Sequence, residues 1–255
     1  EAQLAERPAE GGPAQRLLRR ILWVDDKPER NAYERDALGK LLGVETATTT
    51  QEAERLLRQG GFDGVISDIG RSERGKQDDL KAGARVLALA RELRLPVFFY
   101  SSERAIHAEG QQLMDAGAVV VTSSYVELVR AIRLKARESF DQFVRRALHE
   151  LPGAEAREQV DDIDYLVTLH DGSKLAVETP HWLRIADPKR GESVKARYAK
   201  LSKAINDGMV DRALLVTQKE LLGSEQWLPA PPGVEPVVAD QLPERLAALA
   251  ARPEG

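Results

Sequence analysis

Four short apolar segments, each followed at once by polar residues, constrain the fold of this chain most strongly. They are Ile21 to Val24, Val65 to Ser67, Val97 to Tyr100 and Val119 to Val121. Short apolar runs of this kind are typical of strands buried in a parallel sheet, and helical patterns separate them here. The alternation predicts an α/β domain whose five strands form a doubly wound parallel sheet.

The polar residues at the ends of these strands form the candidate site. Asp25 and Asp26 follow the first of the four runs, and Asp68 follows the second. Ser101 follows the third run, and Ser123 comes just after the fourth. In open α/β sheets, ligands bind at the carboxyl ends of the strands. Three carboxylates that converge there make an oxygen-rich pocket suited to Mg²⁺.

These motifs and their spacing resemble the receiver domain of two-component response regulators over residues 18–126. The resemblance implies that Asp25 and Asp26 bind Mg²⁺ together with Asp68 and the backbone carbonyl of Gly70. It also implies that Asp68 accepts a phosphoryl group, whose oxygens the Ser101 hydroxyl contacts. The implied phosphodonor is a histidine kinase or a phosphotransfer protein.

One element of the family pattern is missing. Receivers carry a Lys after the fifth strand, where it forms a salt bridge to the phosphoryl group, whereas this chain has Thr122, Ser123 and Ser124. Ser123 takes the expected position of that Lys. Two hypotheses follow. Either phosphorylation of Asp68 still shifts the receiver, or the domain is a pseudo-receiver that binds a partner protein without phosphorylation.

The fifth helix of the predicted domain continues beyond it. No Gly or Pro occurs from Tyr125 to Leu151, and apolar residues recur there at steps of three and four. One face of this helix would pack against a second domain, or two chains would pair as a coiled-coil homodimer. The predicted organisation is a disordered lead-in at 1–17, the receiver-like domain at 18–126, a connecting helix at 127–151 and an α/β output domain at 152–255.

The predicted order of elements in the second domain is two or three antiparallel strands, a helix, two strands and a helix. The expected ranges are 163–169, 175–179 and 182–186 for the first strands, 192–207 for the helix, 213–217 and 234–239 for the later strands, and 241–251 for the last helix. This order resembles the core of the restriction-endonuclease-like superfamily, which carries the PD-(D/E)XK motif.

The resemblance to that superfamily indicates a second candidate site. Asp164 and Glu178 lie on the two strands of a predicted hairpin, where two carboxylates could bind Mg²⁺ and activate water. The Lys of the motif is absent because Pro180 stands in its position, so Lys174 or Lys189 would have to replace it. The alternatives are a Mg²⁺-dependent nuclease controlled by the receiver, a degenerate nuclease-like fold that binds a partner protein, and an unrelated α/β module.

Composition limits the partners. The net charge of −4 argues against nucleic acid as a partner of the whole surface. Seven basic residues within 184–203 favour phosphate binding, but Lys195, Lys200 and Lys203 also fit an ordinary solvated helix face. There is no Cys, no apolar run of about 20 residues that would span a bilayer, and no signal-peptide pattern. We therefore expect a cytoplasmic signalling protein with no membrane partner and an output partner that the sequence does not name.

Overall fold

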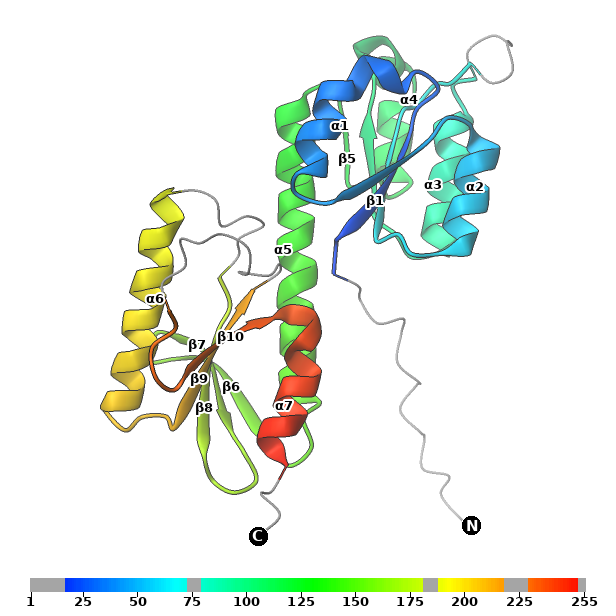
Figure 1. Cartoon of the computed structure of the whole chain (residues 1–255). Helices are drawn as coiled ribbons and strands as arrows, with labels where there is room; N and C mark the ends of the chain where they lie inside the picture. Colours follow the sequence, from blue (N-terminus) through cyan, green and yellow to red (C-terminus); the bar gives the residue numbers. More distant parts are fainter. Residues whose placement is uncertain (1–16, 73–78, 181–187, 218–228, 252–255) are drawn as a thin grey trace, which may run out of the picture.

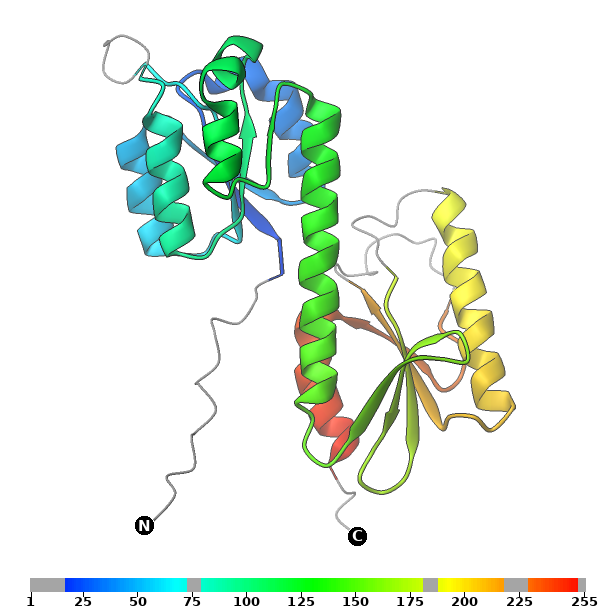
Figure 2. The same cartoon turned by 180° about the vertical axis from the view of Figure 1, so that it is seen from behind.

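The computed structural model describes residues 17–72, 79–180, 188–217 and 229–251, and from 188 to 193 it describes the backbone only. The chain forms two α/β units, and the long helix α5 runs through both (Figures 1 and 2). Among the described residues, no helix is both long and apolar enough to cross a bilayer.

The first unit is built on a parallel sheet with the strand order β2-β1-β3-β4-β5. This is one of the two common orders of doubly wound folds, and its switch point lies between β1 and β3. The strands are β1 (Arg20–Val24), β2 (Gly43–Ala47), β3 (Gly64–Ser67), β4 (Val97–Tyr100) and β5 (Val120–Thr122). The predicted fold class is therefore confirmed for this half of the chain.

Helices cover both faces of this sheet. Residues of α2, α3 and α4 pack with Leu22 and Val24 in one apolar cluster, whereas α1 and α5 pack with Ile21 and Trp23 in the other. The side chains of β1 alternate between these two clusters, which is why its apolar run is continuous. The helices are η1 (Pro28–Asn31), α1 (Ala32–Gly39), α2 (Thr50–Gln59), α3 (Ala82–Glu92), α4 (Glu103–Asp115) and α5 (Tyr125–His149).

The second unit is a mixed sheet with the order β10-β9-β8-β7-β6. Strands β6, β7 and β8 are antiparallel, whereas β8, β9 and β10 are parallel. Helices α5 and α7 cover one face and α6 covers the other. The elements are β6 (Glu155–Val160), β7 (Ile163–Thr168), β8 (Lys174–Glu178), α6 (Pro188–Asn206), β9 (Arg212–Thr217), β10 (Val234–Val238), η3 (Ala239–Gln241) and α7 (Leu242–Ala250).

Three details of the predicted second domain differ from the structure. The antiparallel part contains β6, which precedes the predicted hairpin and was not expected. Helix α6 begins at Pro188 instead of 192. The expected strand at 182–186 lies outside the described residues.

Helix α5 belongs to both apolar cores. Its first half places Leu128 and Ile132 in the core of the first unit, and its second half places Val144 and Leu148 in the core of the second. A straight helix advances by 3.6 residues per turn, so its buried positions recur mainly at steps of three and four residues. These buried positions are Leu128, Ile132, Ala136, Ser139, Phe140, Val144 and Leu148.

The chain just before β1 reinforces this junction. Leu17 packs in the core of the second unit and Leu18 in the core of the first. The backbone N–H of Leu18 donates to Oγ of Ser139 on α5 over 3.3 Å, and Arg19 pairs with Asp240 over 3.1 Å. The predicted lead-in at 1–17 therefore extends one residue too far, because Leu17 is buried.

Candidate functional site

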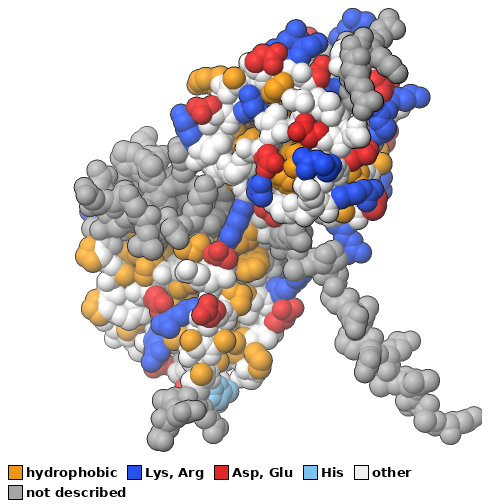
Figure 3. Space-filling model, turned by 45° about the vertical axis from the view of Figure 1, so that its right-hand side comes forward, with side chains coloured by type: hydrophobic (Ala, Val, Ile, Leu, Met, Phe, Trp, Pro, Cys, Tyr) orange, Lys and Arg blue, Asp and Glu red, His pale blue; other side chains and the backbone are white. Residues whose placement is uncertain are grey.

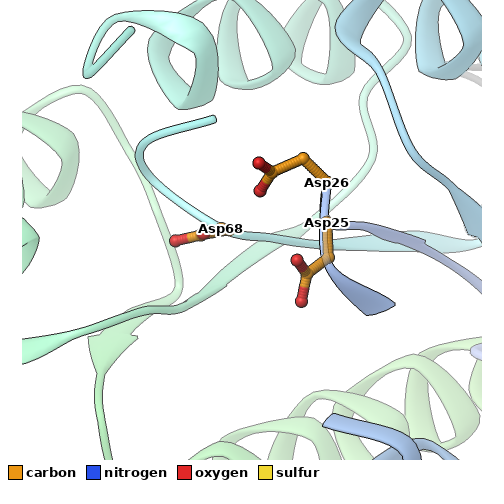
Figure 4. Close-up of side chains that lie close together, drawn as sticks. All are labelled: Asp25, Asp26 and Asp68. Carbon is orange, nitrogen blue, oxygen red and sulfur yellow. The ribbon is translucent and has the colours of Figure 1, made fainter. Parts of the chain in front are cut away.

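Two neighbouring strands bring the predicted acidic residues together. Strands β1 and β3 pair with Val24 opposite Ser67, and the N–H of Asp68 continues the ladder by donating to the Val24 carbonyl over 2.9 Å. Asp25, Asp26 and Asp68 therefore emerge at the same edge of the sheet (Figure 4). One carboxylate oxygen from each lies within 4.8 Å of the others.

The loop after β1 fixes the acidic pair. Both oxygens of Asp25, which is almost fully buried, accept hydrogen bonds, from the Lys27 N–H over 2.8 Å and from Nδ2 of Asn31 over 2.6 Å. Asp26 Oδ2 accepts from the Ser72 N–H over 3.1 Å. The orientation of both carboxylates is therefore set by backbone and amide donors before any ligand arrives.

Asp68 links the acidic cluster to Ser101. Its Oδ1 accepts from Oγ of Ser101 over 2.5 Å and from the Ile69 N–H over 2.7 Å. Burial raises the pKa of Asp68, and repulsion from Asp25 adds to the rise, while the Ser101 hydrogen bond lowers it. Among the described residues Oδ2 of Asp68 has no hydrogen-bond donor, so this oxygen is the one available to a ligand.

The donor set fits a hard divalent cation. Oxygens bound to Mg²⁺ at about 2.1 Å lie at most about 4.2 Å apart, so ligand atoms within 4.8 Å require only small side-chain adjustments. Oδ1 of Asp26 and Oδ2 of Asp68 accept no hydrogen bond from the described residues. The pocket is also lined by Gly70 and Ser123.

Arg71 is a feature of this site that sequence reasoning missed. It is fully buried, and its Nη1 donates to Oγ of Ser67 and to the carbonyl of Asp68, each over 2.8 Å. Its Nη2 donates to Oγ1 of Thr50 at the start of α2 over 3.0 Å. A guanidinium thus ties the end of β3 that carries Asp68 to α2. No local pattern in the charged sequence from Gly70 to Leu80 singles out this Arg.

The second predicted site is brought together in part. Strands β7 and β8 pair with Tyr165 opposite Val177, so Asp164 and Glu178 lie at the same end of the hairpin. The Asp164 N–H donates to Oε1 of Glu178 over 3.2 Å. Lys174 begins β8, at the opposite end of the strand from Glu178, so its predicted role is wrong. The side chain of Lys189 lies outside the described residues.

Two cations from α6 meet these carboxylates instead. Arg197 is bonded to Glu178 and lies 3.3 Å from Asp164. Nζ of Lys200 lies 2.6 Å from Oε1 of Glu178. Glu178 is fully buried, and burial together with the nearby Arg197 lowers the pKa of Lys200. The carboxylates therefore already bind cationic side chains, and Arg197 lies where a metal shared by Asp164 and Glu178 would have to bind.

The basic residues of α6 do not all face solvent. Lys195 and Lys203 are exposed, as expected for a solvated face, but Lys200 is half-buried in the ion-pair network. On the face of the molecule in Figure 3, acidic and basic side chains intermix over the first unit. This face is not the uniformly basic surface typical of nucleic-acid binding.

In its sheet order, its acidic cluster and Ser101, the first unit is similar to the receiver domains of response regulators. Solved structures similar to this half include the receiver domain of the Francisella response regulator 1452, with 16% identity, 48% of this chain and 98% of that chain covered, and a TM-score of 0.39. The response regulator TrrA of Thermotoga maritima in complex with Mg(2+)-BeF has 22% identity over 46% of this chain and 98% of that chain, with a TM-score of 0.39.

A third similar structure carries a different description. It is described as adenylate cyclase from Rhodopirellula baltica and has 16% identity, 52% and 98% coverage of the two chains and a TM-score of 0.42. No protein-family model matches the chain, and no curated protein matches it.

Proposed function

We propose that this chain is a response-regulator-like signalling protein in which Asp68 accepts a phosphoryl group and α5 transmits the change to the C-terminal unit. The observation that carries the proposal is the Ser101–Asp68 hydrogen bond inside a three-carboxylate pocket. Mg²⁺ bound by Asp25, Asp26, Asp68 and the Gly70 carbonyl would neutralise charge between the donor and the acceptor.

The residues of the chain suit an in-line transfer. Oδ2 of Asp68 has no donor among the described residues, so it is the nucleophile. Oδ1, which Ser101 and the Ile69 N–H hold, would bind Mg²⁺ once Ser101 turns away. The new bond joins Oδ2 to phosphorus as the P–N bond of a phosphohistidine donor breaks. The electron pair of that bond stays on the imidazole nitrogen, which then takes a proton.

A short series of contacts leads from the acceptor to α5. The N–H of Ser101 donates to the Thr122 carbonyl over 3.1 Å. Oγ1 of Thr122 donates to Oε2 of Glu127 over 2.5 Å, in the first turn of α5. When Ser101 turns from Asp68 toward a phosphoryl oxygen, the end of β5 and this turn are the first elements to respond. Because α5 packs in both cores, its displacement reaches the second unit.

The test is the intact mass after incubation with Mg²⁺ and a small acyl-phosphate donor. We expect a gain of one phosphoryl group that is lost in Asp68→Asn and retained in Asp36→Asn, a matched removal of an exposed carboxylate on α1. No gain in the wild type with any donor would contradict phosphorylation. It would favour the pseudo-receiver alternative, in which Asp68→Asn leaves partner binding unchanged.

A Mg²⁺-dependent nuclease in the second unit is the other candidate function. The proximity of Asp164, Glu178 and Lys200 favours it, whereas Arg197 between the carboxylates opposes it. Cleavage of DNA or RNA that requires Mg²⁺ and disappears in Glu178→Ala would support this function. Its absence would leave the second unit as a protein-binding output module, alone or as a homodimer.

A further inference from the structure

The phosphorylated site needs a positive charge that Ser123 does not provide. A phosphoryl group replaces the single charge of Asp68 by about two negative charges. Beside Asp25 and Asp26 the site then carries about four negative charges, and a divalent cation offsets only two of them. Ser123 is exposed and lines the pocket, but its hydroxyl is neutral.

Three cationic side chains line the same pocket, Lys27, Arg30 and Arg104. Lys27 pairs with Asp26 over 3.8 Å, so the Asp26 carboxylate already offsets its positive charge. Arg30 and Arg104 are exposed and form no ion pair with any described residue. Arg30 belongs to η1, whose Asn31 binds Asp25, so it lies on the side of the acidic pair and away from Ser101.

Arg104 comes from the side of the pocket where the family Lys would be. It lies in the first turn of α4, three residues after Ser101. Strands β4 and β5 pair with Tyr100 opposite Thr122, so Ser101 and Ser123 follow paired positions at the same edge. Ala105 and Ala108, which follow Arg104 on α4, also line the pocket.

We propose that Arg104 binds the phosphoryl group on Asp68 and so replaces the Lys that receivers carry after the fifth strand. This inference rests on the proposed function. A guanidinium suits the role because it can donate two parallel hydrogen bonds to one phosphoryl group. Its position has a further consequence. The charge belongs to α4, so phosphorylation pulls directly on that helix and not on the loop between β5 and α5.

The experiment measures affinity for beryllofluoride, a phosphoryl analogue, in the presence of Mg²⁺, by calorimetric titration of the full chain. Wild type is compared with Arg104→Ala, Arg30→Ala, Ser123→Lys and the double variant Arg104→Ala with Ser123→Lys. A charge-assisted hydrogen bond contributes about 1.5–3 kcal/mol, which is roughly a 10- to 100-fold change in affinity. We expect Arg104→Ala to weaken binding by this factor and Arg30→Ala to change it less than about threefold.

The double variant separates a specific role from a general charge effect. A Lys at position 123 can bind the same oxygens, so Ser123→Lys in the Arg104→Ala background restores affinity to within about threefold of the wild type. The lifetime of the acyl phosphate, followed by intact mass, should rank the variants in the same order as their affinity for beryllofluoride. Circular dichroism melting of Arg104→Ala should match the wild type because the side chain is exposed.

Three outcomes would overturn the proposal. Binding that Arg104→Ala leaves unchanged overturns the role of Arg104 and leaves phosphorylation of Asp68 intact. Equal losses of affinity in Arg104→Ala and Arg30→Ala would mean that the phosphoryl analogue senses only the general positive charge of the pocket and makes no specific contact with Arg104. Wild-type protein that neither binds beryllofluoride nor gains a phosphoryl group overturns the proposed function and this inference with it.

Discussion

Ser101 donates a 2.5 Å hydrogen bond to Oδ1 of Asp68 and thereby joins the ends of β4 and β3. The same carboxyl is half-buried and faces Asp25, and these two effects outweigh the hydrogen bond, so the pKa of Asp68 is raised. A carboxyl with a raised pKa prefers to be neutral in the folded protein. When no cation is bound, its ionised form at neutral pH therefore lowers the stability of the folded protein.

The first prediction is that Asp68→Asn stabilises the protein in Mg²⁺-free buffer at pH 7. Because folding raises this pKa, the native state binds the proton more tightly, and stability is lost as pH rises through the folded value. The gain in stability from Asp68→Asn should therefore shrink on acidification and vanish below pH 3.8, the ordinary pKa of an Asp carboxyl. Urea unfolding of both proteins between pH 3 and pH 8 measures it.

The control for this prediction is Asp36→Asn. Asp36 lies on α1 and is exposed beside Lys40, so its removal should shift stability by less than about 0.5 kcal/mol. A wild type that is more stable than Asp68→Asn at pH 7 without Mg²⁺ would contradict the prediction. Added Mg²⁺ should stabilise the wild type more than Asp68→Asn, since the variant lacks a ligand.

The second prediction concerns Arg71. Its guanidinium is fully buried and bonded to Ser67, to the Asp68 carbonyl and to Thr50. Arg71→Ala leaves these acceptors without their donor and opens a cavity, so the free energy of unfolding should fall by about 3 kcal/mol. Denaturant unfolding measures the loss.

Two further variants divide that loss between charge and packing. Arg71→Lys retains the charge, but a single ammonium lacks the planar fork that reaches both Ser67 and Thr50, so part of the stability returns. Arg71→Met restores apolar volume alone and should remain less stable than Arg71→Lys. A loss below about 0.5 kcal/mol in Arg71→Ala would show that the buried bonds are not needed.

The sequence predicted the first sheet and its acidic site because both depend on local patterns. Apolar runs mark the central strands, and the polar residues at their ends must share one edge of a parallel sheet. The edge strands β2 and β6 gave no such signal. Gly43–Ala47 is half-exposed, and Glu155–Val160 carries charged residues at three of its six positions, since an edge strand buries less of its surface.

The residues that were missed have partners far away in the chain. Arg71 is buried through contacts with Thr50, and Lys200 pairs with Glu178 from a different element. Helical periodicity places Lys200 beside the apolar stripe of α6, which equally fits solvent or an ion pair. Only the tertiary arrangement decides between the two, because it fixes what lies opposite that face.

The third prediction tests the ion pairs of the second unit. Removal of one partner leaves the fully buried Glu178 carboxylate short of a counter-charge, so Arg197→Ala should cost about 3 kcal/mol of unfolding free energy. Adding Glu178→Gln to Arg197→Ala should recover part of it, because the stranded charge is then removed. A double-mutant cycle by urea unfolding gives the coupling.

Lys195→Ala is the matched control on the same helix. Lys195 is exposed, and its removal should change stability by less than about 0.5 kcal/mol. A double variant that is as unstable as the sum of its single variants would contradict direct coupling between Glu178 and Arg197. The result also bears on the nuclease alternative, since strong coupling means that Arg197 holds the position a shared metal would need.

The fourth prediction is that α5 resists proteolysis along its whole length in the native protein. Trypsin sites at Arg133 and Arg137 are exposed, but cleavage requires about a turn or more of helix to open, and Ala136 and Phe140 are buried in different cores. Opening the middle of α5 therefore disturbs both units and costs much of the global stability. Limited trypsin digestion followed by mass spectrometry should give no early cut between Arg130 and Phe143.

Glu138→Pro is the informative variant for this helix. Proline removes a backbone hydrogen bond in the helix interior and costs about 3 kcal/mol or more, and Glu138 itself is exposed. Early cuts should then appear beside this position. Early cuts in the wild type would contradict a continuous helix. If the variant also splits a single unfolding transition into two, the continuity of α5 is what couples the unfolding of the two units. The Leu18–Ser139 bond is a second link between them. A phosphoryl group at Asp68 would then act on the second unit through α5 and through the contacts of the chain before β1.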